Sequence, residues 1–305
     1  MTPESPGEVG GCHVYHVPVM RDEVLWMLRP RPGGIYLDCT VGGGGHAAAV
    51  LEHAGPDAFL VGIDRDPEAI EFAGRRLAPF AGAFKLVQGN FADLAGILAD
   101  LGIGQVDGVL FDLGVSGHQF DDPGRGFSCM SDGPLDMRMD MGAGPSARDL
   151  VNTLPGAELA RILREYGEER WASRIARFVV ERRKRGPITT TAELVDVVKQ
   201  AIPAAARRSG PHPARRTFQA LRIAVNDELG SLARGLDQAV EAVRPGGRVV
   251  AIAFHSLEDR MVKKKFAESK ERLRTITARP LVPCEEEVQA NPRSRSARLR
   301  AAERF

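Results

Sequence analysis

The sequence predicts an α/β fold: a doubly wound, mostly parallel sheet whose chain is interrupted by an inserted helical domain. Two observations support this prediction. The first 115 residues alternate short apolar runs with helical stretches, which is typical of a parallel sheet covered by helices on both faces. From about residue 146 the apolar residues recur at helical spacing instead, and the strand pattern returns only near residue 244.

Short apolar runs bounded by turn residues mark the expected strands. Those of the first part are residues 34–40, 59–64, 84–90 and 106–114. Helical stretches separate them near residues 46–53, 67–77 and 91–101. The turn Pro245-Gly246-Gly247 introduces a fifth strand in RPGGRVVAIAF, and two weaker runs near the C-terminus favour a closing antiparallel hairpin.

Composition and patterning divide the chain into a tail and two domains. Residues 1–12 have no basic region followed by an apolar core, so they are expected to be a disordered tail and not a signal peptide. Residues 13–140 and 214–305 are expected to form the core domain, and residues 141–213 the helical insertion. The chain is 43% hydrophobic and 27% charged, and no apolar run approaches the roughly 18 residues that span a bilayer. No membrane association is therefore expected.

The predicted insertion contains recognisable helix signals. In LARILREYGEERWASRIARFVVERR the apolar residues recur at helical spacing on both sides of Gly167. Thr190 and Glu193 have the spacing of a capping box that opens the next helix, which Pro203 ends. One long helix is then expected over about 214–243, where the chain returns to the core domain.

The cysteine pattern indicates a reducing compartment. The four cysteines lie far apart in the sequence, so neither a zinc knuckle nor a disulfide framework is predicted. Cys12, His13 and His16 could together contact a metal, but unrelated polar residues near a terminus are the better explanation. We therefore expect no metal site and a cytoplasmic location.

Basic residues are concentrated in the predicted insertion, although the net charge of the chain is only +1. Between Val151 and Arg216 there are fourteen Lys and Arg side chains against seven Asp and Glu. Such a segment is either a solvated helical face or a surface for a polyanion such as RNA, and charge alone does not decide between them. Reversal of Arg182, Arg183 and Arg185 to Glu is the test that the sequence suggests.

The glycine-rich stretch LDCTVGGGGHAAAV follows the first expected strand and opens a helix. Its four consecutive glycines, Gly42 to Gly45, allow the backbone to approach a ligand, and a helix N-terminus favours negative charge. Gly42, Gly44 and Ala47 also satisfy G-x-G-x-x-G/A, so a dinucleotide such as NAD is one candidate ligand.

Residues at the ends of the next strands favour S-adenosylmethionine over NAD. Asp64 ends the second strand, where a carboxylate accepts hydrogen bonds from the ribose hydroxyls of either cofactor. Phe91 follows the third strand and could flank an adenine ring, and Asp112 ends the fourth strand. This series is typical of class I S-adenosylmethionine methyltransferases, whose seven-stranded sheet matches the expected strands.

Longer motifs resemble one family of these enzymes. The stretches RGFSCMSDGPLDMRMD, YGEERWASRIA, RTFQALRIAVNDEL, FHSLEDRMVK and NPRSRSARLR are similar to the bacterial methyltransferases that modify the exocyclic N4 of a cytosine in 16S rRNA of the small ribosomal subunit. The resemblance extends from about His16 to Arg304. It implies a methyltransferase core with a helical insertion, S-adenosylmethionine as cofactor, and a target in the decoding region.

The resemblance also implies cofactor contacts, residue by residue. They are Gly44, Gly45 and His46 in the glycine loop, and Asp64, Phe91, Asp112 and Gln119 after later strands. The sequence departs from the family pattern at Gly117-His118, where many members have a Ser-Pro or similar pair. Because Gln119 directly follows this departure, its assignment as a cofactor contact rests on a weaker match than the others do.

Methylation of an amine makes Asp112 a candidate catalytic residue. The N4 amine is a poor nucleophile because ring conjugation holds its lone pair, so it must be aligned with the sulfonium methyl and needs a hydrogen-bond acceptor. Many amine methyltransferases place a (D/N/S)-P-P-(Y/F) motif here, but this sequence has Asp112-Leu113-Gly114-Val115. Asp112 is therefore expected to bind the cofactor and to accept a hydrogen bond from the amine.

His255 is the second candidate catalytic residue. It follows the fifth strand, where a side chain that titrates near neutral pH is well placed to contact the target base or a phosphate. The alternative is structural, because Ser256 and Asp259 have the spacing of a capping box that starts a helix.

Four further residues are candidates for binding the RNA. Arg222 and Asn226 belong to a polar stripe along the long helix, and Asp136 and Arg138 lie in the GFSCMSDGPLDMRMD stretch. The alternatives are ordinary solvent exposure for the stripe, and an ion pair between Asp136 and Arg138.

The sequence leaves two other functions open. One is a methyltransferase of a small molecule or a protein, which leaves the basic insertion unexplained. The other is an RNA-binding ribosome assembly factor that holds S-adenosylmethionine without turnover. The expected partner is 16S rRNA within the small ribosomal subunit. A homodimer is compatible with the sequence, which does not determine the oligomeric state.

Overall fold

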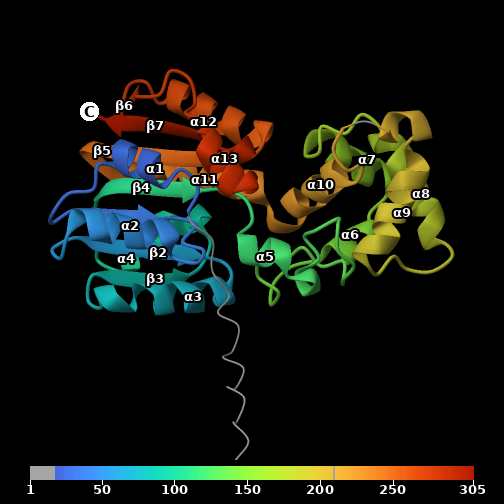
Figure 1. Ribbon diagram of the computed structural model, residues 1–305, viewed down its shortest axis with the longest axis horizontal. Coiled ribbons are helices and arrows are strands. Elements are labelled where there is room, and N and C mark those ends of the chain that lie inside the picture. The colour runs from blue at the N-terminus through green and yellow to red at the C-terminus, as the bar shows by residue number, and fades with distance from the viewer. Residues whose placement is uncertain (1–17, 209) are drawn as a thin grey trace, which may run out of the picture.

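The computed structural model describes residues 18–208 and 210–305, so the expected tail at residues 1–12 lies outside the described residues, as do Cys12, His13 and His16. Figure 1 shows two lobes, one a sheet with helices on both faces and the other a smaller group of helices beside it. No helix in the described ranges is long and apolar enough to cross a membrane.

A seven-stranded sheet forms the larger lobe, in the order β3-β2-β1-β4-β5-β7-β6. The strands are β1 (Ile35–Asp38), β2 (Phe59–Asp64), β3 (Phe84–Gln88), β4 (Val106–Asp112), β5 (Val243–Ala253), β6 (Leu273–Thr275) and β7 (Arg298–Arg304). Strands β1 to β5 are parallel, and β7 is antiparallel to both β5 and β6. The predicted α/β fold with a closing antiparallel hairpin is confirmed.

Helices cover both faces of this sheet. They are α1 (Arg21–Leu28), α2 (Gly45–Ala54), α3 (Pro67–Leu77), α4 (Leu94–Asp100), α11 (Glu228–Ala242) and α12 (Ser256–Glu268). On β4, Val109 and Phe111 join the apolar core shared with α4, α11 and α12, while Leu110 joins the core on the opposite face with α1, α2 and α3. Because successive side chains of a strand point to opposite faces, β4 is buried on both sides, and it delivers Asp112 to the edge of the sheet.

The smaller lobe has an apolar core of its own. Its helices are α6 (Ala147–Thr153), α7 (Gly156–Glu165), α8 (Ala172–Arg183), α9 (Thr191–Ala201) and α10 (Arg215–Asn226). The buried residues of this core all lie between Phe127 and Leu221, and none comes from the sheet. Helix α9 opens with the predicted capping box between Thr190 and Glu193. The domain boundaries at 141 and 213 remain a prediction, and the apolar core extends beyond both of them.

The single helix expected over about 214–243 is wrong, because the chain breaks between α10 and α11. Asp227 has a φ of 47°, a left-handed conformation that ends one helix and begins the next. Aspartate is among the few side chains that tolerate this conformation. The apolar spacing continues across the break, so periodicity does not reveal it.

Strand β5 begins earlier than expected. The turn Pro245-Gly246-Gly247 lies inside the strand, with Gly246 at a φ of 80°. The register between β4 and β5 shifts between Val106 and Gly108, opposite this segment. An irregularity of this kind bends a strand without ending it. Strand β5 therefore pairs with β4 on both sides of the shift.

Candidate active site

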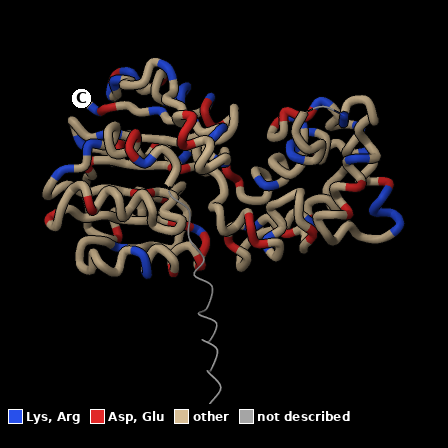
Figure 2. The backbone as a smooth tube through the Cα atoms, in the orientation of Figure 1, with Lys and Arg blue, Asp and Glu red and all other residues tan. Residues whose placement is uncertain are grey.

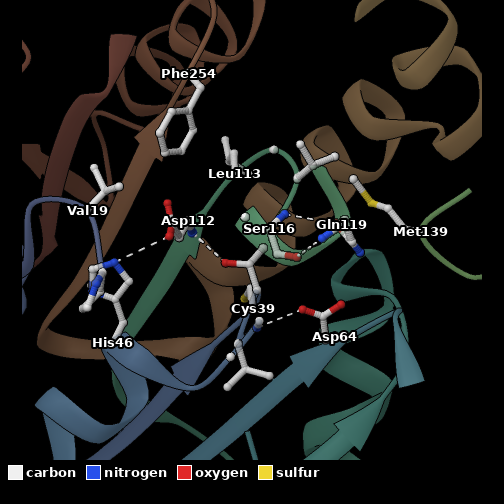
Figure 3. A pocket seen from close by; sticks show the side chains of 18 of the residues that line it. Val19, Cys39, His46, Asp64, Asp112, Leu113, Ser116, Gln119, Met139 and Phe254 are labelled. Atoms are coloured by element: carbon white, nitrogen blue, oxygen red, sulfur yellow. Dashed lines mark hydrogen bonds and ion pairs between the residues drawn. The ribbon is translucent and has the colours of Figure 1, made fainter. Parts of the chain in front are cut away.

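A pocket opens at the carboxyl ends of β1, β2 and β4, where open α/β sheets bind their ligands. Asp64 and Asp112, which end β2 and β4, line it together with His46 of α2, and Phe254 follows β5. Figure 3 shows His46 beside Asp112 on one side of this space and Asp64 on another. The structure therefore brings together three of the residues expected to bind the cofactor.

The glycine loop between β1 and α2 packs closely on α3. Gly44 is the N-cap of α2 with a φ of 76°, and a Cβ on it would lie 3.2 Å from Cα of Ala73. Residues with a side chain rarely adopt this backbone conformation. Gly42 and Gly45 line the pocket, whereas Gly44 lies against Ala73. The cofactor contact of Gly44 remains a prediction.

The carboxylate of Asp64 links this loop to the end of β2. Its Oδ2 accepts a hydrogen bond from the backbone N–H of Gly42 at 2.9 Å, and its Oδ1 accepts from that of Asp66 at 3.0 Å. Burial raises the pKa of Asp64 to about 6, although both backbone N–H groups lower it. The carboxylate is therefore mostly ionised at neutral pH and accepts hydrogen bonds from ligand hydroxyls.

Asp112 and His46 form a polar pair on the other side of the pocket. Nε2 of His46 lies 3.5 Å from Oδ2 of Asp112, and the backbone N–H of Asp112 donates to Oγ1 of Thr40 at 2.7 Å. Oδ1 of Asp112 and both ring nitrogens of His46 are buried without a hydrogen-bond partner in the described part of the chain. Such atoms are costly unless they are paired, so this pair is suited to bind a polar ligand.

Asp38 is a second buried carboxylate near this pair, and it was not predicted from the sequence. It ends β1, is 2% exposed, and accepts a hydrogen bond from the backbone N–H of Thr40 at 3.1 Å. Burial raises the pKa of Asp38 to about 7; the charge of His46 lowers it, and the charge of Asp112 raises it. Asp38 therefore titrates near neutral pH.

Phe91 lines the pocket after β3, and its predicted contact with the cofactor adenine remains a prediction. It opens the short helix η2 (Phe91–Asp93) and packs edge-on against Phe111, with the ring centroids 5.5 Å apart. A Cβ on Gly235 of α11 would lie 2.7 Å from the Phe91 ring. The close approach of α11 therefore holds this ring in place.

Gln119 also lines the pocket, from the short helix α5 (Gly117–Asp121). Its Oε1 accepts a hydrogen bond from the backbone N–H of Ser116 at 3.0 Å, and its Nε2 donates to Oδ2 of Asp66 at 2.7 Å. His118 is not among the lining residues, and its Nε2 lies 3.2 Å from the carboxylate of Glu68. The departure at His118 thus leaves Gln119 at the pocket, and its contact with the cofactor remains a prediction.

Asp136 and Arg138, two predicted RNA contacts, pair with each other. Nε and Nη2 of Arg138 donate to the two carboxylate oxygens of Asp136 at 2.9 and 2.8 Å. Arg222 makes a similar two-point pair with Glu228. These ion pairs account for the side chains within the protein, and RNA binding by Asp136, Arg138 and Arg222 remains a prediction.

Asn226 holds the loop that contains Met137 and Met139 against the end of α10. Its Nδ2 donates to the carbonyl of Met137 at 2.8 Å, and its Oδ1 accepts from the backbone N–H of Met139 at 2.8 Å. Met139 lines the pocket, and Met137 has a φ of 65°. The Asn226 side chain is 3% exposed, so we infer that it positions this loop; its contact with RNA remains a prediction.

Asn226→Ala should loosen the loop at residues 128–145 without unfolding the protein. The change leaves the Met137 carbonyl and the Met139 N–H buried and unpaired, at a cost of about 1–3 kcal/mol each. Limited proteolysis followed by mass spectrometry should detect faster cleavage in this loop than in the wild type. Equal cleavage rates would contradict the role assigned to Asn226.

His255 caps α12 and is not among the residues that line the pocket. Its Nδ1 accepts a hydrogen bond from the backbone N–H of Glu258 at 3.4 Å, and the Glu258 carboxylate accepts from the backbone N–H of His255 at 3.3 Å. His255 and Glu258 therefore form the capping box, so the expected box of Ser256 and Asp259 is wrong by one residue. Asp259 pairs with Arg300 instead. Histidine is not among the preferred caps. A catalytic role for His255 remains a prediction.

Five charged residues of the pocket lining were not predicted from the sequence. They are Arg65 after β2, Arg76 of α3, Glu228 at the start of α11, Glu258 of α12, and Arg293 of the short helix η5 (Pro292–Ser296). Arg293 reaches α5, where it pairs with Asp121 and donates to the carbonyl of Gly117 at 3.4 Å. The motifs FHSLEDR and NPRSRS contain Glu258 and Arg293, whereas Glu228 follows the unforeseen helix break.

The residues around the pocket fit S-adenosylmethionine. The ribose of this cofactor needs hydrogen-bond acceptors, and Asp64 offers them at the pocket; its adenine needs an apolar wall, of which Phe91 and Leu232 offer the right kind of surface. Its amino-acid end carries an ammonium and a carboxylate, and so needs an acceptor and a donor. The unpaired atoms of Asp112 and His46 are of these two kinds.

Known proteins resemble this chain over nearly its whole length. The profile of the MraW methylase family matches residues 13–305. The ribosomal RNA small subunit methyltransferase H of Geobacter sulfurreducens is 55% identical over 307 residues, which cover 95% of this chain and 99% of that protein. The protein of the same name from Heliobacterium modesticaldum is 51% identical over 309 residues, with coverage of 95% and 99%.

A solved structure of an rRNA methylase from Streptococcus thermophilus gives a TM-score of 0.43 at 9% identity, and covers 93% of each chain. The family profile and the two relatives each match more than nine-tenths of the sequence, and the relatives share more than half of the aligned residues. The chain therefore belongs to the MraW methylase family.

Proposed function

We propose that this protein transfers the methyl group of S-adenosylmethionine to the exocyclic N4 of a cytosine in 16S rRNA. Its family makes it a methyltransferase, and S-adenosylmethionine is its cofactor. The relatives are named for small-subunit ribosomal RNA, which supports this RNA as the substrate. The observation that carries the proposal is the position of Asp112, a carboxylate with an unpaired oxygen in the same pocket as the expected cofactor-binding residues.

Different residues of the pocket bind the cofactor and align the target amine with its methyl group. S-adenosylmethionine supplies, when bound, a methyl group activated by a sulfonium cation. Asp64 accepts from the ribose hydroxyls, and Phe91 lies against the adenine. The carboxylate of Asp112 can accept several hydrogen bonds, and besides one from the cofactor ammonium it accepts one from the N4 amine, which turns the amine lone pair toward the methyl group. The proton that leaves N4 needs only a modest base, and the carboxylate of Asp112 is one.

A cytosine within folded RNA must leave its stack to reach this pocket. The enzyme must therefore hold the RNA backbone on either side of the target, and we assign this task to the helical lobe. Figure 2 shows Lys and Arg along the end of this lobe farthest from the sheet. Contacts to phosphates from such a surface supply affinity without reading sequence.

Helix α8 and the residue before its N-cap present three exposed arginines suited to this task. Arg170, Arg174 and Arg177 follow one another at spacings of four and three, and none makes an ion pair within the described residues. Their guanidinium groups lie 4.9 to 5.8 Å from the ring centroids of Trp171 and Phe178. Guanidinium groups stacked on aromatic rings keep their N–H edges free for phosphates.

The structure changes the charge-reversal test that the sequence suggested. Arg182 pairs with Glu193 at 2.9 Å, and Nη1 of Arg183 donates to the carbonyls of Val151 and Leu154 at 2.8 Å each. Reversing these two arginines would break contacts inside the lobe as well as change its charge. Loss of RNA binding in that variant would therefore be ambiguous.

Replacing Arg170, Arg174 and Arg177 together with Gln should weaken RNA binding and spare the cofactor. In a plot of the logarithm of RNA affinity against the logarithm of salt concentration, each lost phosphate contact makes the slope about one unit less steep. The slope of the triple variant should therefore be less steep by about three units. Lys85→Gln, an exposed change on the edge strand β3, serves as the control and should leave the slope unchanged. An unaltered slope in the triple variant removes these arginines from the RNA surface.

A labelled-methyl assay tests the function itself. The protein is offered assembled small subunits, naked 16S rRNA, DNA and a metabolite extract, and the label should enter RNA alone. Nucleoside mass spectrometry should then identify N4-methylcytidine. Label in any other substrate contradicts an RNA methyltransferase, and cofactor binding without transfer supports an assembly factor.

The physiological substrate is proposed to be the RNA within the small subunit, in the cytoplasm. The assay above compares assembled subunits with naked RNA, and faster transfer to naked RNA would contradict the first of these proposals. A homodimer remains a prediction, which sedimentation of the purified protein tests.

A further inference from the structure

A compact group of charged side chains lies where the helical lobe joins the sheet. It consists of Arg222 on α10, Glu228 on α11, and His255 and Glu258 at the start of α12, and we call these four residues the Arg222 cluster. Nε and Nη2 of Arg222 donate to the two carboxylate oxygens of Glu228 at 2.8 and 2.9 Å. One carboxylate oxygen of Glu228, one of Glu258 and a ring nitrogen of His255 all lie within 4.8 Å of one another.

The cluster forms part of the pocket wall. Glu228 and Glu258 line the same pocket as Asp64 and Asp112. Nε2 of His255 lies 3.2 Å from Oε1 of Glu258 but outside hydrogen-bond geometry, so this buried nitrogen has no hydrogen-bond partner among the described residues. The side chain of His255 is only 10% exposed. The cluster is therefore a built polar site with hydrogen-bonding capacity left over, and not only a surface ion pair.

Two members of the cluster are charged at neutral pH. Burial lowers the pKa of Arg222, but the charge and hydrogen bonds of Glu228 and the charge of Glu258 raise it above its ordinary value. Burial raises the pKa of Glu258, but its interactions with His255 and the charge of Arg222 bring it below its ordinary value. Each oxygen of Glu228 accepts one hydrogen bond from the guanidinium and keeps a second lone pair, which can accept a hydrogen bond from a ligand.

We propose that Glu228 selects the target base by accepting a hydrogen bond from its exocyclic amine, and that Arg222 is the positioning residue that holds Glu228 in place. An ionised carboxylate accepts hydrogen bonds and donates none. Cytosine offers an amine at the position where uracil has a carbonyl oxygen. A fixed carboxylate therefore attracts cytosine and repels uracil. This inference rests on the proposed function, because it requires a pyrimidine base in the pocket.

Binding of two mononucleotides tests the inference without relying on turnover. Cytidine and uridine 5′-monophosphates are titrated into protein saturated with S-adenosylhomocysteine, and NMR measures both affinities. The wild type should prefer the cytidine nucleotide by about tenfold or more, the range expected for a hydrogen bond to a charged acceptor. Glu228→Gln should reduce this preference to below about threefold, because an amide both donates and accepts.

Two controls separate selection from general damage. Glu241→Gln changes an exposed glutamate on the same helix, paired with Arg272, and should keep the full preference. The affinity of Glu228→Gln for S-adenosylhomocysteine should stay within about twofold of the wild type. If Glu228→Gln does not fold, Glu228→Asp retains the charge on a shorter side chain. It should keep the order of the two affinities while weakening both.

A second comparison tests Arg222 as the positioning residue. Arg222→Lys keeps the positive charge but loses the two-point contact, so it should retain part of the nucleotide preference. Arg222→Gln should lose it, and should lower kcat for methyl transfer more than it raises KM. A purely structural role would lower the melting temperature of both variants and leave the preference of the folded protein intact.

The outcomes distinguish this inference from the proposed function. Unchanged nucleotide preference in folded Glu228→Gln overturns the inference, as does a wild type that binds both nucleotides equally. A reversal of the two affinities in Glu228→Asp overturns it as well. Absence of N4-methylcytidine from RNA treated with the wild type contradicts the proposed function instead, even where the preference for cytidine is present.

Discussion

Asp64→Ala should lower the affinity for S-adenosylmethionine about a hundredfold, since each hydrogen bond to a charged acceptor contributes about 1.5–3 kcal/mol. The carboxylate is expected to accept from the ribose hydroxyls, and it already holds the glycine loop through the N–H of Gly42. The variant therefore loses ligand contacts and the anchor of the loop together. Calorimetric titration with S-adenosylhomocysteine measures the effect.

A conservative variant and an exposed control variant help to interpret this experiment. Asp64→Asn keeps one acceptor oxygen and should bind the cofactor with intermediate affinity. Asp57→Ala alters an exposed aspartate just before β2 and should bind like the wild type. If Asp64→Ala binds as tightly as the wild type, Asp64 does not belong to the ribose site.

Asp38→Asn should stabilise the protein without its cofactor by up to about 4 kcal/mol at pH 8. Burial raises the pKa of Asp38 from 3.8 to about 7. Ionised Asp38 therefore lowers the free energy of unfolding above pH 7. This loss decreases as the pH falls and disappears below about pH 3.8. Asparagine is never charged, and its oxygen can still accept from the Thr40 N–H.

Urea unfolding at two pH values measures this difference. The advantage of Asp38→Asn should fall from about 4 kcal/mol at pH 8 to about 2 kcal/mol at pH 5, where the native wild type is protonated. Asp57→Asn, at an exposed position, should stay within about 0.5 kcal/mol of the wild type. An advantage of Asp38→Asn that is equal at both pH values would show that another cause is responsible.

The sheet and its strand-end residues follow from the sequence because both depend on local patterns. The run from Val106 to Asp112 is almost wholly apolar and ends in a carboxylate, which is what a strand buried on both faces looks like. Parallel strands place their carboxyl ends along one edge. The sequence alone therefore suffices to assign Asp64 and Asp112 to one site.

The part of the site formed by the starts of α11 and α12 could not be predicted in this way. Glu228 reaches the pocket because Asp227 takes a left-handed conformation, and the apolar spacing on either side gives no sign of it. His255 displaces Ser256 as the cap of α12 through a contact between its ring and Glu258. The first outcome is a backbone conformation that apolar spacing does not report, and the second is a local cap made by a residue that is not among the preferred caps.

The two strands that pair with β4 are synthesised at very different times. Val109 pairs on one side with Leu37 of β1, early in the chain, and on its other side with Val249, which follows the whole helical lobe. Arg293, near the C-terminus, lines the same pocket as Asp64. A growing chain on the ribosome therefore cannot complete the wall of this pocket until Arg293 has emerged. A chain that stops before Arg293 lacks this part of the pocket wall.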